Sequence, residues 1–215
     1  VIAADVSAVG TPRNALAAAN YGGDKAIFAY GNDGSITNTS NLVNSSGVVA
    51  SDTTGVGTTR TDLGAAGYGG DKALFAYGAA PSSSVTNVSN LVSSSGVVSA
   101  DVTGVGTARR YLAAAGYGVG LAIFGYGRTA GGTTDHLSMT NLVNSSGVVG
   151  SDVSGVGTAR NALAAVSYGE DKALFGFGNG GPGSTAEVSM TNLVSNVGVV
   201  GTDVTGVGTA RKGLA

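Results

Sequence analysis

The string Gly-Thr-x-Arg recurs five times along the 215 residues, and this recurrence constrains the fold more than any other feature of the sequence. A fixed period near fifty residues indicates one repeated supersecondary unit, whose copies bury each other's apolar faces. The arginines of the five strings are Arg13, Arg60, Arg109, Arg160 and Arg211. The sequence therefore predicts one domain, 1–215, with repeats at about 13–59, 60–108, 109–159 and 160–210, and with the ends 1–12 and 211–215 as parts of a closing unit.

All variation in length falls in one segment of each unit. The separation between the constant Arg and the Gly that closes strings such as DKALFAYG is the same in all four units, and so is the separation between the Leu of NLV and the next Arg. Only the stretches between that Gly and that Leu differ, always by an even number of positions; they run from Gly31 to Leu42, Gly78 to Leu91, Gly127 to Leu142 and Gly178 to Leu193. Residues added in pairs lengthen both arms of a hairpin equally and keep each side chain on its own face. The variable segment is therefore predicted to be a hairpin tip.

Each unit is predicted to contain four short strands. In the second unit they run from Leu63 to Tyr68, Lys72 to Tyr77, about 85–92 and about 97–102, with glycine-rich turns between them. No apolar stripe of helical period persists, so no helix is expected. The first strand consists of small residues, and we expect it to be the innermost strand, where converging sheets leave little room.

The parts GVGTAR, LAAAGYG, DKALFAYG, VSNLV and GVVSADVT follow one another in this order. The pattern resembles the kelch repeat, in a divergent form similar to tandem propeller repeats of phage tail and environmental surface proteins. The usual double glycine is replaced by Ala-Tyr-Gly, Gly-Tyr-Gly or Gly-Phe-Gly, and valines stand where an outer-strand Trp is expected. The resemblance implies an all-β fold, a β-propeller of four-stranded blades with four complete repeats and a partial composite fifth blade.

The chain begins and ends on the same piece of the repeat, VIAADVSAVGTPRNALA and VVGTDVTGVGTARKGLA. Two closures are open: a four-bladed ring with one surplus strand, or a composite fifth blade that joins both ends. The second is favoured, because closure by strand mixing hides sheet edges. It implies either a fragment of a longer chain or a partner, such as a second copy exchanging strands, that supplies the missing strands.

Composition argues against several partners and cofactors. The formal net charge is −2 and the positive charges are scattered, which gives no footprint for nucleic acid. No apolar run is long enough to span a bilayer. The chain has no cysteine and one histidine, so thiolate metal sites, triads and the copper centre of kelch-type oxidases are hard to build. We expect no cofactor and no metal.

Charges and aromatic residues that recur in every unit are interpreted as structural. An acid recurs eight residues before each constant Arg, at Asp5, Asp52, Asp101, Asp152 and Asp203. A cation-binding ring is conceivable, but a turn or ion pair needed by every unit explains five copies better. An aromatic residue also recurs at the end of the second strand, at Tyr30, Tyr77, Tyr126 and Phe177. Packing between units is favoured over sugar stacking for these rings.

The hairpin tips vary in both length and chemistry, which is typical of a binding surface on a constant scaffold. The candidate ligand-binding residues are Asn32, Asp33, Arg128, Asp135, His136 and Glu187. No catalytic residues are assigned, because the non-repeating acids lie in different units. The sequence predicts a non-catalytic binding or structural module of an extracellular or virion surface that meets a protein or glycan through these loops. A lectin with repeated weak sites and a sugar-modifying enzyme are the alternatives.

Overall fold

The computed structural model describes residues 7–132, 135–181 and 186–214, and it is all-β. Four three-stranded antiparallel sheets follow one another along the chain, one in each repeat, and we number these units 1 to 4. A 3-10 turn at Pro81–Ser83 (η1) is the only helical element among the described residues, and no helix there is long and apolar enough to cross a membrane. The sheets are β1 (Ala17–Tyr21), β2 (Lys25–Asn32) and β3 (Ile36–Val43); β4 (Gly64–Tyr68), β5 (Lys72–Ala76) and β6 (Ser89–Val92); β7 (Ala113–Tyr117), β8 (Leu121–Gly125) and β9 (Thr140–Val143); and β11 (Ala164–Tyr168), β12 (Lys172–Gly176) and β14 (Thr191–Val194).

The first two strands of each unit form a tight hairpin in the predicted position. In unit 2, Tyr68 of β4 pairs with Lys72 of β5 across a turn whose Gly69 and Gly70 both have positive φ, 62° and 84°. Side chains larger than glycine rarely adopt this conformation, which explains the Gly-Gly-Asp string. Two additional short strands, β10 (Arg160–Asn161) and β13 (Asn179–Gly180), pair with each other in unit 4.

The predicted fourth strand is wrong as a continuous element. In unit 2 it is reduced to two isolated bridges, Val98 with Val92 and Val102 with Ser89, and units 1, 3 and 4 repeat this pattern. The two bridges are three residues apart on β6 and four apart on the outer segment, so one extra residue interrupts the ladder. The Asn90 side chain donates to the Ser99 carbonyl oxygen at 3.0 Å inside this interruption, and so satisfies a group that a regular ladder would have paired.

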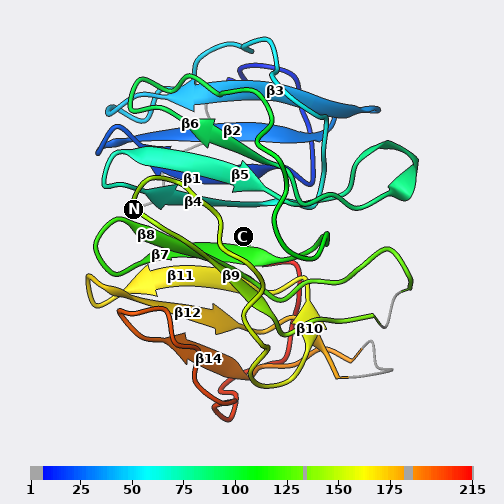
Figure 1. Ribbon diagram of the computed structural model, residues 1–215. Coiled ribbons are helices and arrows are strands. Elements are labelled where there is room, and N and C mark those ends of the chain that lie inside the picture. The colour runs from blue at the N-terminus through cyan, green and yellow to red at the C-terminus, as the bar shows by residue number, and fades with distance from the viewer. Residues whose placement is uncertain (1–6, 133–134, 182–185, 215) are drawn as a thin grey trace.

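The first strands lie innermost, as their small residues predict. Strand β1 packs against β4, β4 against β7, and β7 against β11. Figure 1 shows these four strands in the middle of the molecule, with β3 and β14 at the top and bottom. Side chains of all four first strands also line shared cavities. The units are therefore arranged around a common central space.

Neighbouring units are joined by a repeated aromatic and arginine contact. The ring of Tyr77 in unit 2 lies 5.7 Å from the ring of Phe124 in unit 3, and the guanidinium carbon of Arg109 lies 4.2 Å from the centre of the Tyr77 ring. All three side chains are fully buried. Tyr30, Phe75 and Arg60 repeat the contact between units 1 and 2, and Tyr126, Phe175 and Arg160 repeat it between units 3 and 4. This confirms the packing interpretation for the three tyrosines.

The outer faces of the first and last units lack this cover. Phe28 is 38% exposed, whereas its equivalents Phe75, Phe124 and Phe175 are fully buried. In unit 4, Val166, Tyr168 and Leu193 are 56%, 40% and 47% exposed, although the tyrosines equivalent to Tyr168 are about 4–5% exposed. Both end units therefore present an apolar face of the kind that is buried at each internal interface.

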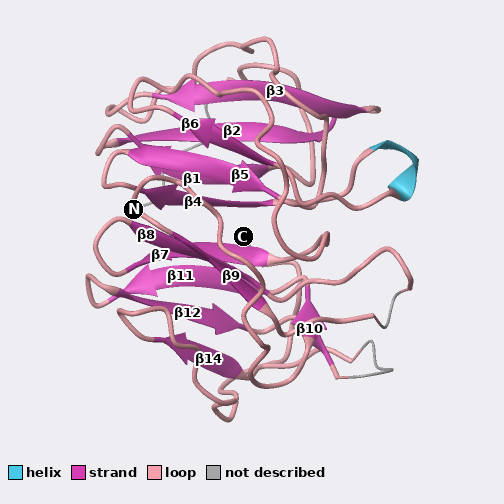
Figure 2. Cartoon of the chain, in the orientation of Figure 1, coloured by secondary structure: helices cyan, strands magenta, loops and turns pink. Residues whose placement is uncertain are grey.

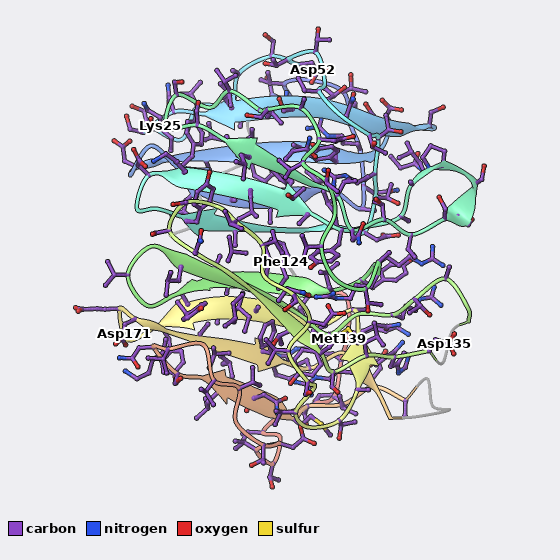
Figure 3. All side chains as sticks on the ribbon, in the orientation of Figure 1. Lys25, Asp52, Phe124, Asp135, Met139 and Asp171 are labelled. Atoms are coloured by element: carbon purple, nitrogen blue, oxygen red, sulfur yellow. The ribbon has the colours of Figure 1, made fainter. Side chains whose placement is uncertain are left out.

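The hairpins between the second and third strands gather at one end of the molecule, opposite the Gly-rich turns that carry Lys25 and Asp171 (Figures 2 and 3). The base of each hairpin has the same pairing, Asn32 with Ile36, Ala79 with Val85, Arg128 with His136, and Asn179 with Glu187. The even steps in length keep this register, as expected. The added residues lie beyond this pair, in the loop.

Candidate functional site at the hairpin rim

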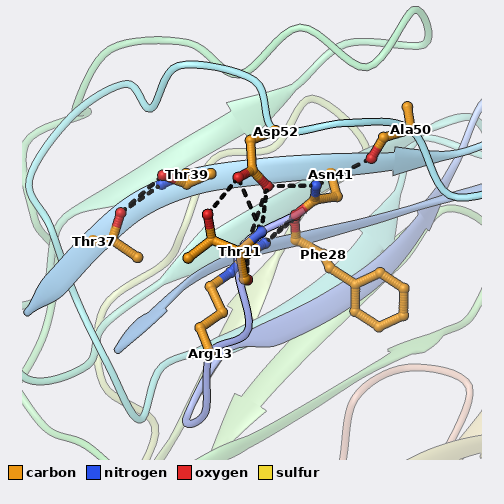
Figure 4. A network of polar contacts seen from close by, with 8 residues as sticks. All are labelled: Thr11, Arg13, Phe28, Thr37, Thr39, Asn41, Ala50 and Asp52. Carbon is orange, nitrogen blue, oxygen red and sulfur yellow. Dashed lines mark hydrogen bonds and ion pairs between the residues drawn. The ribbon is translucent and has the colours of Figure 1, made fainter. Parts of the chain in front are cut away.

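A polar network with a buried asparagine at its centre fixes the constant part of each unit. In unit 1, Asp52 accepts hydrogen bonds from the Thr11 hydroxyl at 2.7 Å and from the Asn41 Nδ2 at 2.8 Å (Figure 4). Asn41 Oδ1 in turn accepts from Arg13 Nη2 at 2.6 Å, and Arg13 Nη1 lies 3.8 Å from Asp52. The hydrogen bond from Thr11, and then that from Asn41, lowers the pKa of Asp52 below its usual value. The equivalent groups in the next three units are Thr58, Asn90, Asp101 and Arg60; Thr107, Asn141, Asp152 and Arg109; and Thr158, Asn192, Asp203 and Arg160.

These recurring acids are therefore structural, as the repeat indicates. Asp52, Asp152 and Asp203 lie within 4.0 Å of the constant Arg of their own unit, about forty residues earlier in the chain, and the charge of Arg60 acts in the same way on the pKa of Asp101. Asp5 lies outside the described residues. Among the described residues no group of three or more His, Asp or Glu side chains could hold a metal ion.

A row of variable residues lies directly beside this constant scaffold. In every unit three residues pair side by side. In unit 3, Arg110, which follows the constant Arg, pairs with Arg128, which follows the closing Gly of the second strand. Arg128 also pairs with His136, the first residue after the hairpin loop, and the other units have the same pairings. We call these three residues the rim triplet. The rim triplets are Asn14, Asn32 and Ile36; Thr61, Ala79 and Val85; Arg110, Arg128 and His136; and Asn161, Asn179 and Glu187. Residues directly opposite each other on neighbouring strands project on the same face, so each triplet presents one chemical surface.

The triplet of unit 3 concentrates positive charge. The guanidinium carbons of Arg110 and Arg128 lie 5.3 Å and 5.0 Å from the centre of the Tyr111 ring. Arg128 Nη1 donates to the Gly132 carbonyl oxygen at 2.9 Å, whereas the Arg110 side chain makes no hydrogen bond within the described part of the chain. Neither arginine has a carboxylate within ion-pair distance among the described residues. This pair differs from Arg109, whose guanidinium binds Asn141 and two backbone carbonyls.

One acid lies next to this pair. Burial raises the pKa of Asp62 above its usual value, and the positive charge of Arg110, the hydroxyls of Tyr111 and Thr61 and the charge of Arg128 oppose the shift. The Tyr111 backbone N–H donates to the Asp62 carbonyl oxygen at 2.9 Å, which ties unit 3 to unit 2. The two arginines and Asp62 together carry a net charge of about +1, and the exposed Asp135 adds one negative charge farther out in the hairpin loop.

A central cavity of about 680 Å³ opens beside Asp62 and Tyr111. Most of its wall is apolar, because the leucine three residues after each of the five constant arginines lines it. These leucines are Leu16, Leu63, Leu112, Leu163 and Leu214. A concave, mostly apolar space with a few polar groups is the usual form of a small-molecule site. Asp62 and Tyr111 therefore connect the cavity with the two arginines of the rim.

The structure brings together some of the residues selected from the sequence and separates others. Arg128 and His136 pair with each other in unit 3, and Asp135 is exposed in the loop between them, where Thr129 Oγ1 donates to it at 3.4 Å. Asn32 and Asp33 border a shallow depression on unit 1. Glu187 lies on unit 4 and forms an exposed ion pair with Lys212 at 3.8 Å.

Sequence reasoning missed Arg110 and Tyr111. Both follow the constant Arg109 in a segment that the repeat alignment treats as scaffold. A signal was present, because the two residues after the constant Arg vary among the five copies: Asn-Ala, Thr-Asp, Arg-Tyr, Asn-Ala and Lys-Gly, with only one pair repeated. Variation next to an invariant residue marks these positions as part of the rim.

No protein-family model matches the chain, and no curated protein matches its sequence. The site is therefore interpreted from its own geometry.

Proposed function

We propose that this chain is a non-catalytic, kelch-like β-propeller module that recognises a partner through its hairpin rim. One observation carries the proposal: the polar network and the aromatic contacts repeat from unit to unit, whereas the rim triplets differ in charge and size. A constant scaffold with variable residues gathered at one end is the usual layout of a binding surface. We place the module on an extracellular or virion surface, in adhesion, receptor or glycan recognition, or assembly.

Glycan recognition is the form of binding that the rim supports best. The central cavity has the volume of small-molecule sites, and polar groups for hydroxyl recognition border it. A lectin with one equivalent site per unit is less well supported, because the rim triplets are not equivalent and the interface tyrosines are buried.

The propeller proposal includes a ring completed by one further sheet of the same kind between units 4 and 1. Its support is the start of a fifth unit. The Arg211 guanidinium carbon lies 4.2 Å from the centre of the Phe177 ring, and Gly178 N–H donates to the Arg211 carbonyl oxygen at 2.9 Å, as at each internal interface. The exposed faces that carry Phe28 and Tyr168 would be covered by such a sheet.

A glycan array tests the proposed function. The full chain is compared with a variant in which residues 128–136 are replaced by Ala79–Val85, the shorter hairpin of unit 2. This exchange keeps the base pairing and register, because both hairpins start and end on equivalent residues. We expect the full chain to bind a restricted set of glycans and the exchange to abolish that binding. Binding to no glycan would contradict glycan recognition, and unchanged binding after the exchange would contradict recognition through the rim.

A further inference from the structure

We propose that the rim of unit 3 binds a carboxylate group, with Arg110 and Arg128 as its ligands and the ring of an acidic sugar in the adjoining cavity. This inference rests on the proposed function and names the ligand class of the same rim. It is carried by two cations that have no acid partner within ion-pair distance among the described residues, beside a cavity of suitable size.

The two arginines have free hydrogen-bonding capacity. The Nε atoms of Arg110 and Arg128 are shielded from solvent and have no hydrogen-bond partner among the described residues. The constant arginines also leave Nε unpaired, but their terminal nitrogens are used by an asparagine and by backbone carbonyls. Within the described ranges Arg110 has no such partner. A guanidinium offers five donors in a planar fork that matches the two oxygens of a carboxylate.

The surroundings of the pair hold it in place. Both guanidinium groups stack at about 5 Å from the same Tyr111 ring, and their backbones are paired with each other in both directions, with N···O distances of 3.0 Å and 2.9 Å. Cation–π stacking restricts the rotamers of the two side chains before a ligand arrives. Binding therefore loses less conformational entropy than it would with two free arginines.

The charge of the site favours a monoanion. Asp62 offsets one of the two arginines. Asp135 is exposed beyond the Arg128–His136 pair, in the hairpin loop, and makes no ion pair with either arginine, so the charge directly at the two guanidinium groups is about +1. A carboxylate neutralises this charge, whereas a phosphate dianion would bring an excess negative charge close to Asp62. Tyr111 and Asp62 also line the cavity, so a ring attached to the carboxylate extends over the leucine-lined wall, with the Asp62 carboxylate as acceptor for a ring hydroxyl.

Isothermal titration calorimetry with D-glucuronate tests the inference. D-glucose serves as the neutral analogue, and benzoate and inorganic phosphate test the other sources of the anion. The variants are Arg110→Gln and Arg128→Gln, and the matched control is Lys172→Gln, which removes one positive charge from an exposed ion pair with Asp171 at the end of the molecule opposite the rim. Urea unfolding midpoints within error of the parent chain confirm that each variant is folded.

We expect saturable binding of glucuronate, binding at least about tenfold weaker in either arginine variant, and less than about a twofold change in the lysine control. Glucose should bind at least about tenfold more weakly than glucuronate. Four results would each overturn the inference. The chain could fail to bind glucuronate, or bind glucose with equal affinity. It could bind phosphate or benzoate more tightly than glucuronate, or the arginine variants could bind like the parent chain. Array binding confined to neutral glycans would overturn it too, while leaving the proposed function standing.

Discussion

Replacing Asn141 by Ala should destabilise the protein more than any exposed polar substitution. Asn141 is fully buried in unit 3, where its Oδ1 accepts from Arg109 Nη2 at 2.7 Å. Its Nδ2 donates to the Gly150 carbonyl oxygen at 3.0 Å and to Asp152 Oδ1 at 2.9 Å. The substitution removes all three hydrogen bonds and leaves a buried guanidinium short of an acceptor.

The magnitude follows from these contacts. A neutral hydrogen bond contributes about 1 kcal/mol and a hydrogen bond to a charged group about 1.5–3 kcal/mol, so the three bonds together contribute roughly 4–7 kcal/mol. Water can replace part of the lost contact at Asp152, whose side chain is 30% exposed. We therefore expect a loss of about 3–5 kcal/mol in the free energy of unfolding, which for a chain of this size lowers the melting temperature by roughly 10 °C.

Urea unfolding followed by far-ultraviolet circular dichroism measures the loss. Asn14→Ala, at an exposed position, is the matched control and should change the free energy of unfolding by less than about 0.5 kcal/mol. Asn90→Ala should cost as much as Asn141→Ala, because its contacts to Arg60, Ser99 and Asp101 are the same. A cost for Asn141→Ala no greater than that of Asn14→Ala would refute the structural role of the network.

Three further outcomes are expected. Burial raises the pKa of Tyr126 to about 12 and also raises the pKa of Tyr30 and Tyr77, so the folded protein holds these protons longer than the unfolded chain. The stabilisation that these protonated phenols provide should therefore be constant below about pH 10 and be lost between about pH 10 and 12. The same phenols should ionise last in an absorbance titration at about 295 nm, and a single step near pH 10 in the folded protein would contradict this. Burial of Asp152 opposes its ionisation, but hydrogen bonds from Thr107 and Asn141 outweigh burial and lower its pKa, as the equivalent bonds do for Asp101 and Asp203 in their own units. The resulting stabilisation is present above about pH 4 and is lost as the pH falls below about 4. The urea midpoint of the parent chain should therefore be lower at about pH 3 than at about pH 6, and Asp152→Asn should show a smaller difference between the two pH values. An equal midpoint at both pH values in the parent chain would contradict this role of the acids. Gly178→Ala should cost more stability than Gly23→Ala, although both glycines have positive φ, 105° and 83°. A Cβ at Gly178 would lie 2.6 Å from the Asn161 carbonyl oxygen, whereas a Cβ at Gly23 would meet nothing within 4 Å. Equal melting temperatures of the two variants would contradict this packing.

The all-β fold was accessible from sequence because the constraints repeat. The glycine-rich turns and the small-residue strands recur with the same spacing, so register and strand order within a unit follow from pattern alone. The outer strand was predicted wrongly because its alternating valines give a strand pattern, whereas the side chain of Asn90 binds the Ser99 carbonyl and interrupts the ladder. A side chain that competes with backbone hydrogen bonds for a carbonyl oxygen does not change the hydrophobic pattern of the sequence, so the pattern cannot predict the interruption.

The candidate site was only partly accessible. Variation in loop length directed attention to Arg128 and His136, but the pairing of Arg128 with Arg110 joins two strands at the base of the hairpin rather than at its tip. Asp62 reaches the same corner from the preceding unit, one whole repeat earlier in the chain. Contacts between units depend on how one sheet packs on the next, which spacing within a unit does not specify.

Four sheets around a common cavity is the central claim, and distances between spin labels test it most directly. The chain has no cysteine, so labels can be attached to pairs of cysteines introduced at Val48, Val97, Val148 and Val199. These equivalent residues of units 1 to 4 are all about 60% exposed. Pulsed electron paramagnetic resonance should give equal distances for 48–97 and 97–148, a longer distance for 48–148, and a distance for 48–199 no longer than that for 48–148. A steady increase from 48–97 through 48–148 to 48–199 would show sheets stacked in a line and would contradict the account.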